Sequence, residues 1–368
     1  MPTEVYEGII DALGPDCASL AQCALTCRAW LPRSRYNLYR RTTLRSQAQL
    51  SSFSQTLHNS PVGSEPCPAD IVEELILWPM GITQRMFVNS ACITLAGDLP
   101  RLKELSITFD HDLSHLRRAM RLDFSLPIHI ASFPNLKRLR LHNTVLNSFM
   151  TLGRAIVALP NLSSLDLSSV IWRTSGAMSS NLLILKVGCC KLEDITISGP
   201  WRGMSGVSAI FRAASPQTMR TIAVDVTATV ASEEFETFLQ YLPTYTSLTT
   251  FTMTLVPSSE SSHHTKGPAI IALLNNLPSM QRLRRFTLDF PHGSYTHAST
   301  ALLRTLADNM PDLSGRLERL EIRIRILDLP DRSADYLWRR KPVPALLPPS
   351  FFEFHALWKR GILKVVMI

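Results

Sequence analysis

The chain has 368 residues, more than the roughly 100–200 of a usual domain, so it has room for a small domain and a large one or for a repeat array. Hydrophobic residues make up 45% and charged residues 18%, which excludes a wholly disordered chain. The net charge of +8 favours acidic partners in general.

No run of about 18 apolar residues is present that could span a membrane. The chain starts with MPTEVYEGIIDALG, which has no Lys, no Arg and no apolar core of a secretory signal. The seven cysteines are an odd number in a long chain, which favours reduced thiols over a disulfide framework. We therefore expect an intracellular protein of the cytoplasm, the nucleus or both.

Residues 1–45 carry the pattern of three short helices. Val5, Ile9 and Leu13 recur at four-residue spacing, and a Gly-Pro pair then ends this first helix. Asp16 is a candidate N-cap for the second helix. A unit this small rarely has a sufficient core, so we expect it to pack against a partner or a neighbouring domain.

This stretch resembles the F-box motif, in the form seen in basidiomycete fungal proteins. The matching residues are Pro2, Glu4, Ile9, Leu13, Leu20, Cys23, Leu25, Cys27, Trp30 and the pair Leu38-Tyr39. An F-box usually begins Leu-Pro, whereas Met1 occupies the Leu position here.

The resemblance implies that the helical unit docks on a Skp-type adaptor, which bridges to a cullin–RING scaffold. The residues that it implies to face the adaptor are Pro2, Val5, Ile9, Leu20, Leu25 and Trp30. The alternative is that these side chains only form a helical cap on the rest of the chain.

Residues 46–72 contain Ser-Ser, Ser-Pro, Gly-Ser and Pro-Cys-Pro steps and are predicted to be a linker, with a short helix from Ala48 to Leu57 as the alternative for that part. Residues 73–327 carry a repeated Leu-x-x-Leu-x-Leu pattern. The filled copies are RLKELSI, NLKRLRL, NLSSLDL, NLLILKV, TMRTIAV, SLTTFTM, RLRRFTL and RLERLEI, with EELIL as a partial copy. Their middle anchors lie about 31 residues apart on average, wider than the roughly 20–29 of leucine-rich repeats.

Dipeptides that end in Pro precede many copies, and helical patterns precede several of these. The dipeptides are Leu99-Pro100, Phe133-Pro134, Leu159-Pro160, Leu242-Pro243, Leu277-Pro278 and Met310-Pro311. Pro ends a helix and restricts the residue before it. The predicted fold is therefore an α/β solenoid with parallel strands inside and helices outside. The region resembles the divergent leucine-rich repeats of F-box proteins.

Residues 328–368 combine helix-breaking prolines with several Phe and Trp residues. We interpret this segment as a cap over the last repeat, which a solenoid needs for solubility. The alternative is a peptide-like docking arm.

No catalytic signature of the GxSxG, GxxxxGK[ST], GxGxxG or HExxH type is present. His111 and His115 have the i,i+4 spacing of a helical metal site, but we interpret them as part of a solvated loop. The sequence thus predicts no enzyme, catalytic residue, cofactor or metal. Nucleic acid is not the expected partner, because the aromatic and basic signatures of the common modules are absent.

The candidate target-binding surface is the sheet face that points away from the apolar core. Side chains alternate faces along a strand, so the x positions of the pattern lie on that face. They form a threonine-lined trough with basic patches, which suits an acidic or phosphorylated segment. The candidate residues are Arg138, Arg140, His142, Lys186, Arg285, Arg319 and Arg323. The alternative is that these are ordinary solvated strand faces.

These expectations describe a substrate-recognition subunit of a Skp–cullin–F-box ubiquitin ligase. Such a subunit acts by proximity, since it holds a target protein near the conjugating enzyme. The alternative function is a non-ligase leucine-rich-repeat interaction scaffold with an F-box-like helical cap.

Overall fold

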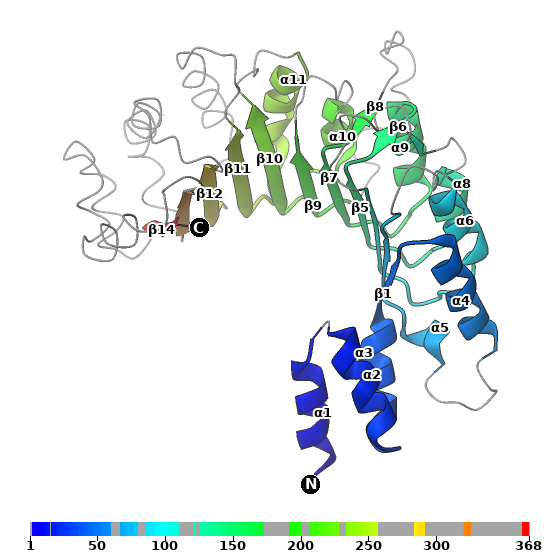
Figure 1. Ribbon diagram of the computed structural model, residues 1–368. Helices are drawn as coiled ribbons and strands as arrows, with labels where there is room; N and C mark the ends of the chain where they lie inside the picture. Colours follow the sequence, from blue (N-terminus) through cyan, green and yellow to red (C-terminus); the bar gives the residue numbers. More distant parts are fainter. Residues whose placement is uncertain are drawn as a thin grey trace, which may run out of the picture. The chain divides into compact units, whose positions relative to one another are not determined.

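A computed structural model gives the fold, and the chain forms two compact units, Met1–Ile184 and Leu185–Ile368 (Figure 1). The residues that the structure describes are 2–14, 16–59, 67–79, 86–109, 121–122, 126–172, 191–199, 207–227, 233–256, 283–290, 319–324 and 363–367.

The first unit opens with three helices, α1 (Thr3–Ala12), α2 (Cys17–Thr26) and α3 (Leu31–Arg40). Gly14 has a φ of 57° in the turn between α1 and α2, a conformation that glycine adopts without steric cost. The carboxylate of Asp16 accepts hydrogen bonds from the N–H groups of Ala18 and Ser19, at 3.1 and 3.2 Å. Asp16 is therefore the N-cap of α2, as its position in the sequence predicts.

Five parallel strands follow in chain order in the main sheet of this unit. They are β1 (Arg41–Leu44), β2 (Glu74–Leu77), β3 (Glu104–Thr108), β5 (Arg138–His142) and β7 (Ser164–Ser168). Between consecutive strands the chain passes through helices that cover one face of the sheet (Figure 1). Parallel strands need such crossovers, and the coarse prediction of an α/β fold with parallel strands is confirmed.

Among the connecting helices, α4 contacts α5 and α6, α6 contacts α8, and α8 contacts α9. They are α4 (Gln47–His58), α5 (Pro68–Ile71), α6 (Phe87–Thr94), α8 (Leu126–Ile130) and α9 (Phe149–Val157). A small parallel sheet of β4 (Arg121–Leu122), β6 (Val145–Leu146) and β8 (Ile171–Trp172) lies in the same unit.

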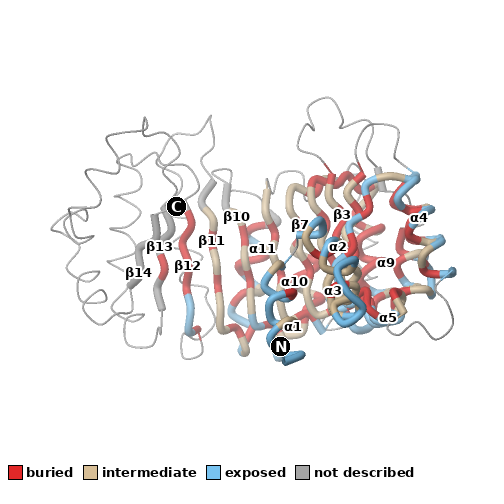
Figure 2. The backbone as a smooth tube through the Cα atoms, turned by 60° about the horizontal axis from the view of Figure 1, so that its bottom comes forward, coloured by how far each residue is buried: buried red, intermediate tan, exposed pale blue. Residues whose placement is uncertain are grey.

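The leucine pattern forms the core of the first unit. The three filled copies within it place Leu102, Leu105, Ile107, Leu136, Leu139, Leu141, Leu162, Leu165 and Leu167 at 3% exposure or less. The residues between them on β5 and β7 are only half-buried, so buried and partly exposed positions alternate along each strand (Figure 2). This alternation puts the x positions on the face opposite the core, as predicted.

Three of the predicted Pro dipeptides start turns into the strands of the first unit, whereas Leu277-Pro278 and Met310-Pro311 lie outside the described residues. The turns are Leu99–Leu102, Phe133–Leu136 and Leu159–Leu162, and in each the last N–H donates to the first carbonyl at 3.1–3.2 Å. Pro occupies the second position, where its fixed φ suits a β-turn.

Asparagine side chains tie successive turns together. The Nδ2 of Asn135 donates to the carbonyl of Pro100 at 2.7 Å, and the Nδ2 of Asn161 donates to that of Pro134 at 2.9 Å. Each asparagine follows the Pro of its own turn and reaches back one repeat. The Pro-Asn pairs therefore hold neighbouring repeats at a fixed spacing.

The second unit has a parallel sheet of β9 (Asp194–Ser198), β10 (Thr221–Thr227), β11 (Thr250–Val256), β12 (Arg285–Phe290), β13 (Arg319–Ile324) and β14 (Leu363–Met367), in chain order. Two described helices, α10 (Val207–Ala213) and α11 (Glu233–Tyr241), contact each other, and the short 3-10 helix Leu242–Thr244 follows. The pattern residues Ile222, Phe251 and Phe286 are fully buried.

The element boundaries differ from the predicted domains at both ends. Strand β1 lies inside residues 1–45, and α4 and α5 lie inside the predicted linker 46–72. The pair Thr42 and Leu44 is buried against the sheet, because β1 pairs in parallel with β2. Strand β14 lies inside the predicted cap 328–368, since it pairs with β13.

Strand β9 was not predicted. Its anchors Leu192, Ile195 and Ile197 are fully buried and follow the same pattern with Ile in two places. Ile195 lies 30 residues after Leu165 and 27 before Ile222, which is close to the mean repeat length. The predicted copy NLLILKV (181–187) lies outside the described residues.

Candidate binding surfaces

An apolar surface is exposed on α1 and α2. Val5 and Ile9 are 47% and 50% exposed on α1, and Leu25 is 80% exposed on α2. Ile10 turns inward and is fully buried, so α1 has one face in the core and Val5 and Ile9 on another. Val5 and Ile9 are neighbours one turn apart, and we call these two residues with Leu25 the apolar helix surface.

The other predicted adaptor-facing residues divide between surface and interior. Pro2 is exposed, and Trp30 is half-buried with its ring 6.3 Å from that of Tyr6, centroid to centroid. Leu20, by contrast, is 1% exposed. Leu20 therefore serves the packing of the three helices and does not reach the surface.

A polar clamp holds α1 against α3. The Arg33 guanidinium forms a two-pronged ion pair with Asp11, and the Asn37 Nδ2 donates to the same carboxylate at 2.9 Å. These hydrogen bonds, from Arg33 first and Asn37 second, hold the pKa of Asp11 below its ordinary value. The clamp fixes the helix that carries Val5 and Ile9.

The polar face of the sheet in the first unit is built in rows across the strands. The strand register places Arg41, Glu74, Glu104, Arg138 and Ser164 in one row. The next row on this face, two residues further along each strand, is Thr43, Ile76, Ser106, Arg140 and Asp166. Thr108, His142 and Ser168 form a third row over β3, β5 and β7.

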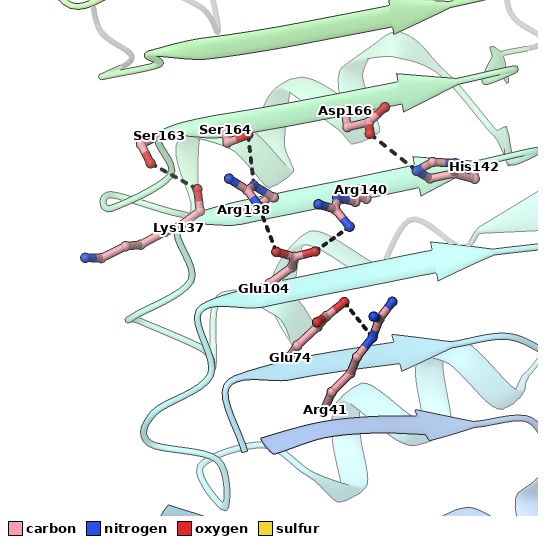
Figure 3. Close-up of polar contacts among 10 residues, drawn as sticks. All are labelled: Arg41, Glu74, Glu104, Lys137, Arg138, Arg140, His142, Ser163, Ser164 and Asp166. Carbon is pink, nitrogen blue, oxygen red and sulfur yellow. Dashed lines mark hydrogen bonds and ion pairs between the residues drawn. The ribbon is translucent and has the colours of Figure 1, made fainter. Parts of the chain in front are cut away.

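The structure brings Arg138, Arg140 and His142 together on β5, but each has an acidic partner on a neighbouring strand (Figure 3). Glu104 on β3 accepts from Arg138 Nη1 at 3.1 Å and pairs with Arg140 Nη1 at 2.7 Å. The His142 Nε2 lies 3.5 Å from a carboxylate oxygen of Asp166 on β7. The predicted basic patch is thus an ion-pair network.

The edge where the strands begin carries a second ion-pair network. Glu73, which precedes β2, pairs with Lys103 at 2.5 Å and with Arg40 at 3.0 Å. These contacts, with that of Lys103 the strongest, hold the pKa of Glu73 below its ordinary value. Arg41 pairs with Glu74 at 3.2 Å one row further in. The sequence did not point to these residues, because Glu73 and Lys103 precede their strands and Arg40 and Arg41 lie in the part that resembles the F-box.

The polar face of the sheet in the second unit is more deeply buried on its later strands. Thr250, Thr252 and Thr254 on β11 are half-buried, as expected for a threonine-lined face. On the next strand, Thr287 and Asp289 are 2% and 6% exposed. Glu321 on β13 is also buried, at 4% exposure.

The remaining predicted target-binding residues are only partly accounted for by the described structure. Arg285 is exposed, and its register partner on β13 is Arg319. Arg323 is the register partner of Asp289, so a buried acid lies in the same row. Lys186 lies outside the described residues.

Asp225 on β10 is an acid in a partly buried polar setting. Burial raises its pKa above the ordinary value, and the charge of Asp289 adds to this. Hydrogen bonds from Thr254, from the Gly199 N–H at 3.1 Å and from Ser198 act in the opposite direction.

Metal ligands are not grouped in the described part of the chain, where no cluster of three or more His, Cys, Asp or Glu residues could hold an ion. His111 and His115 lie outside it. Cys92 on α6 is fully buried, and burial raises the pKa of its thiol to about 12. A thiol in such a setting is a packing group and not a nucleophile.

The fold and surfaces define a parallel α/β protein with three helices at its amino-terminal end. No helix within the described ranges combines the length and apolar character needed to cross a membrane.

Comparison with known proteins gives little likeness. No family model matches the chain, and no curated protein matches its sequence. A solved structure of a Bacteroides fragilis protein is similar at 13% identity with a TM-score of 0.36, and the match covers 65% of this chain and 72% of that one. A TM-score of this size does not define a common fold.

Proposed function

We propose that this protein is the substrate-recognition subunit of a Skp–cullin–F-box ubiquitin ligase. Its three amino-terminal helices would bind the Skp-type adaptor, and its strand-and-helix repeats would bind the target protein. The chain itself carries out no chemistry in this role. It raises the effective concentration of target lysines near the charged conjugating enzyme.

The observation that carries the proposal is the apolar helix surface. Val5, Ile9 and Leu25 are 47%, 50% and 80% exposed on a unit of three short helices. Several exposed apolar side chains on one small unit are typical of a protein interaction site. Their positions are among those that the resemblance to the F-box motif assigns to the adaptor.

The link between the helices and the sheet also supports a receptor role. Helix α3 ends at Arg40 and β1 begins at Arg41, so no flexible linker separates them. Helix α3 also contacts α5 and β1. A rigid link of this kind would hold a bound target at a fixed distance from the adaptor, which favours transfer to particular lysines.

Co-expression with a Skp-type adaptor tests the proposal. The wild-type chain should elute from gel filtration as a stable complex with the adaptor. The double variant Val5→Asp/Ile9→Asp should lose the complex, because two carboxylates would be buried without partners in the interface. Circular dichroism of the variant should match that of the wild type, since both positions are about half exposed.

A matched control separates a specific interface from general surface hydrophobicity. Ile93 on α6 and Val157 on α9 are 54% and 53% exposed, close to the values of Ile9 and Val5. The double variant Ile93→Asp/Val157→Asp should keep the complex. If the folded wild-type chain forms no complex, the ligase role is wrong, and a repeat scaffold with another partner becomes the better description.

A further inference from the structure

The strands of the first unit begin along one edge of the sheet, and two rows of side chains follow that edge. The residues that precede the strands are Arg40, Glu73, Lys103, Lys137 and Ser163. The first residues of the strands are Arg41, Glu74, Glu104, Arg138 and Ser164. We call the five cations of these rows, Arg40, Arg41, Lys103, Lys137 and Arg138, the basic edge.

Backbone hydrogen bonds place the residues that precede the strands in register. The Glu73 N–H donates to the Arg40 carbonyl at 3.0 Å, and the Lys103 N–H donates to that of Glu73 at 2.8 Å. The Lys137 N–H donates in turn to the Lys103 carbonyl at 2.8 Å. The cations of the basic edge therefore lie along one ladder on β1, β3 and β5, with the acids of β2 between the first two strands.

Charge and exposure differ between the cations and the acids of these rows. Five cations stand against the three carboxylates of Glu73, Glu74 and Glu104, a net charge of 5 − 3 = +2. The side chains of the four cations that form ion pairs are 43–57% exposed, whereas those of the carboxylates are 15–23% exposed. An approaching partner therefore meets mainly positive charge.

The carboxylates orient the cations and leave donors unused. A guanidinium has five N–H donors, and Arg138 uses its Nε toward Ser164 and its Nη1 toward Glu104. Glu104 is shared with Arg140, so it does not saturate Arg138. The Lys137 ammonium points away from the sheet in Figure 3, and no ion pair is recorded for it among the described residues. Such preorganised donors lower the entropic cost of binding.

We propose that the basic edge binds an acidic peptide segment in an extended conformation, laid across the strands. The assignment of that segment to the target of a ligase depends on the function proposed above, but the binding site itself does not. Neighbouring strands lie about 4.8 Å apart and an extended peptide rises about 3.3 Å per residue. The cations lie along β1, β3 and β5, and β2 separates the first two of these strands. Acidic residues about three positions apart would therefore meet the cations of β1 and β3, and residues one or two positions apart would meet those of β3 and β5.

A peptide fits these rows better than a nucleic acid. The ten positions of the two rows contain no aromatic residue, so they offer no platform on which bases could stack. The three carboxylates would repel a backbone that carries a charge at every nucleotide. A peptide can place neutral residues opposite them.

Fluorescence anisotropy tests the site with a labelled 12-residue peptide of alternating Glu and Ser, against a Gln-Ser peptide of the same length. The full chain should bind the acidic peptide and not the neutral one. Lys137→Glu should weaken binding about tenfold, because it places a like charge at the contact. The Lys137 side chain forms no ion pair with the described residues, so this change breaks none.

The charge-matched control is Arg154→Glu. Arg154 is exposed on α9, which covers the opposite face of the sheet. This variant should bind the acidic peptide as the wild type does. Equal binding by Lys137→Glu and wild type, or equal losses in both variants, would overturn the proposal.

Two further probes decide the class of partner. A 12-nucleotide single-stranded DNA or a vesicle rich in anionic lipid that binds more tightly than the acidic peptide would also overturn it. Adaptor co-purification on the same samples keeps the two proposals apart. Peptide binding without adaptor binding would leave the basic edge valid and remove only the ligase role.

Discussion

The polar faces of the two units use the same strand positions in different ways. In the first unit, the charged residues Glu104, Arg138, Arg140 and Asp166 keep side-chain exposures of 15–43% and pair across the strands. In the second unit, Thr287, Asp289 and Glu321 occupy corresponding outward positions at 2–6% exposure. The first unit thus leaves the charged residues of its polar face partly exposed, whereas the second unit buries the polar residues of β12 and β13.

This difference shows that an outward position in the repeat pattern is not always a solvent-exposed one. The alternation of side chains fixes which face a residue lies on, but the surroundings of that face decide its exposure. A charged residue costs little on the first face and much on the second. Binding surfaces should therefore be sought on the polar face of the first unit.

The largest expected effect comes from placing the same charge on each face. Thr287→Asp should lower the free energy of unfolding by about 3–5 kcal/mol, because it buries a carboxylate opposite that of Glu321, its register partner. Thr43→Asp, at an exposed position of β1, should change it by less than about 0.5 kcal/mol. Urea unfolding of both variants measures the contrast. Equal, small effects would show that the face over β12 is open to water.

The repeat pattern in the sequence predicted most of the apolar framework. Leucines at positions such as Leu105, Leu139 and Leu165 pack in the core, and Pro dipeptides start the turns. These features could be predicted because the spacing within one repeat fixes them. Strand β9 was missed because NLLILKV offered a competing match ten residues earlier.

The ion pairs of the candidate surfaces could not be predicted in the same way. Glu104 and Arg138 are 34 residues apart, and their contact depends on the register between two strands. The sequence analysis therefore read Arg138 and Arg140 as an unpaired basic patch. The resemblance to the F-box motif likewise put Leu20 among the adaptor-facing residues, whereas its side chain is 1% exposed among the three helices.

Lowering the pH should change the stability contributions of Asp225 in the second unit and Glu73 in the first unit in opposite directions. The raised pKa of Asp225 means that the folded state binds the proton more tightly, so wild type should gain stability relative to Asp225→Asn as pH falls from 7 toward 4. The lowered pKa of Glu73 has the opposite effect. Its ion pairs stabilise fully above the ordinary value of 4.5, and wild type should lose its advantage over Glu73→Gln below that pH.

Urea unfolding of wild type, Asp225→Asn and Glu73→Gln at pH 7, 5 and 3.5 measures how their free energies of unfolding change with pH. The two differences from wild type should move in opposite directions with pH. Parallel slopes would contradict the distinction between a paired surface acid in the first unit and a buried acid in the second.

The smallest expected effect concerns the residue that follows three of the strands, β5, β7 and β9. Asn143 after β5, Ser169 after β7 and Gly199 after β9 all have a positive φ, of 53°, 53° and 117°. Asparagine and glycine tolerate this conformation, whereas serine is strained in it. Ser169→Gly, which copies the residue of the second unit, should raise the free energy of unfolding by about 0.5 kcal/mol once the entropy of the unfolded chain is included.

Ser168→Gly is the control, since it lies within β7 and should lower stability by roughly 0.5–1 kcal/mol. If both variants lose stability equally, the positive φ at Ser169 carries no strain, and the glycine after β9 has no energetic advantage over the serine after β7.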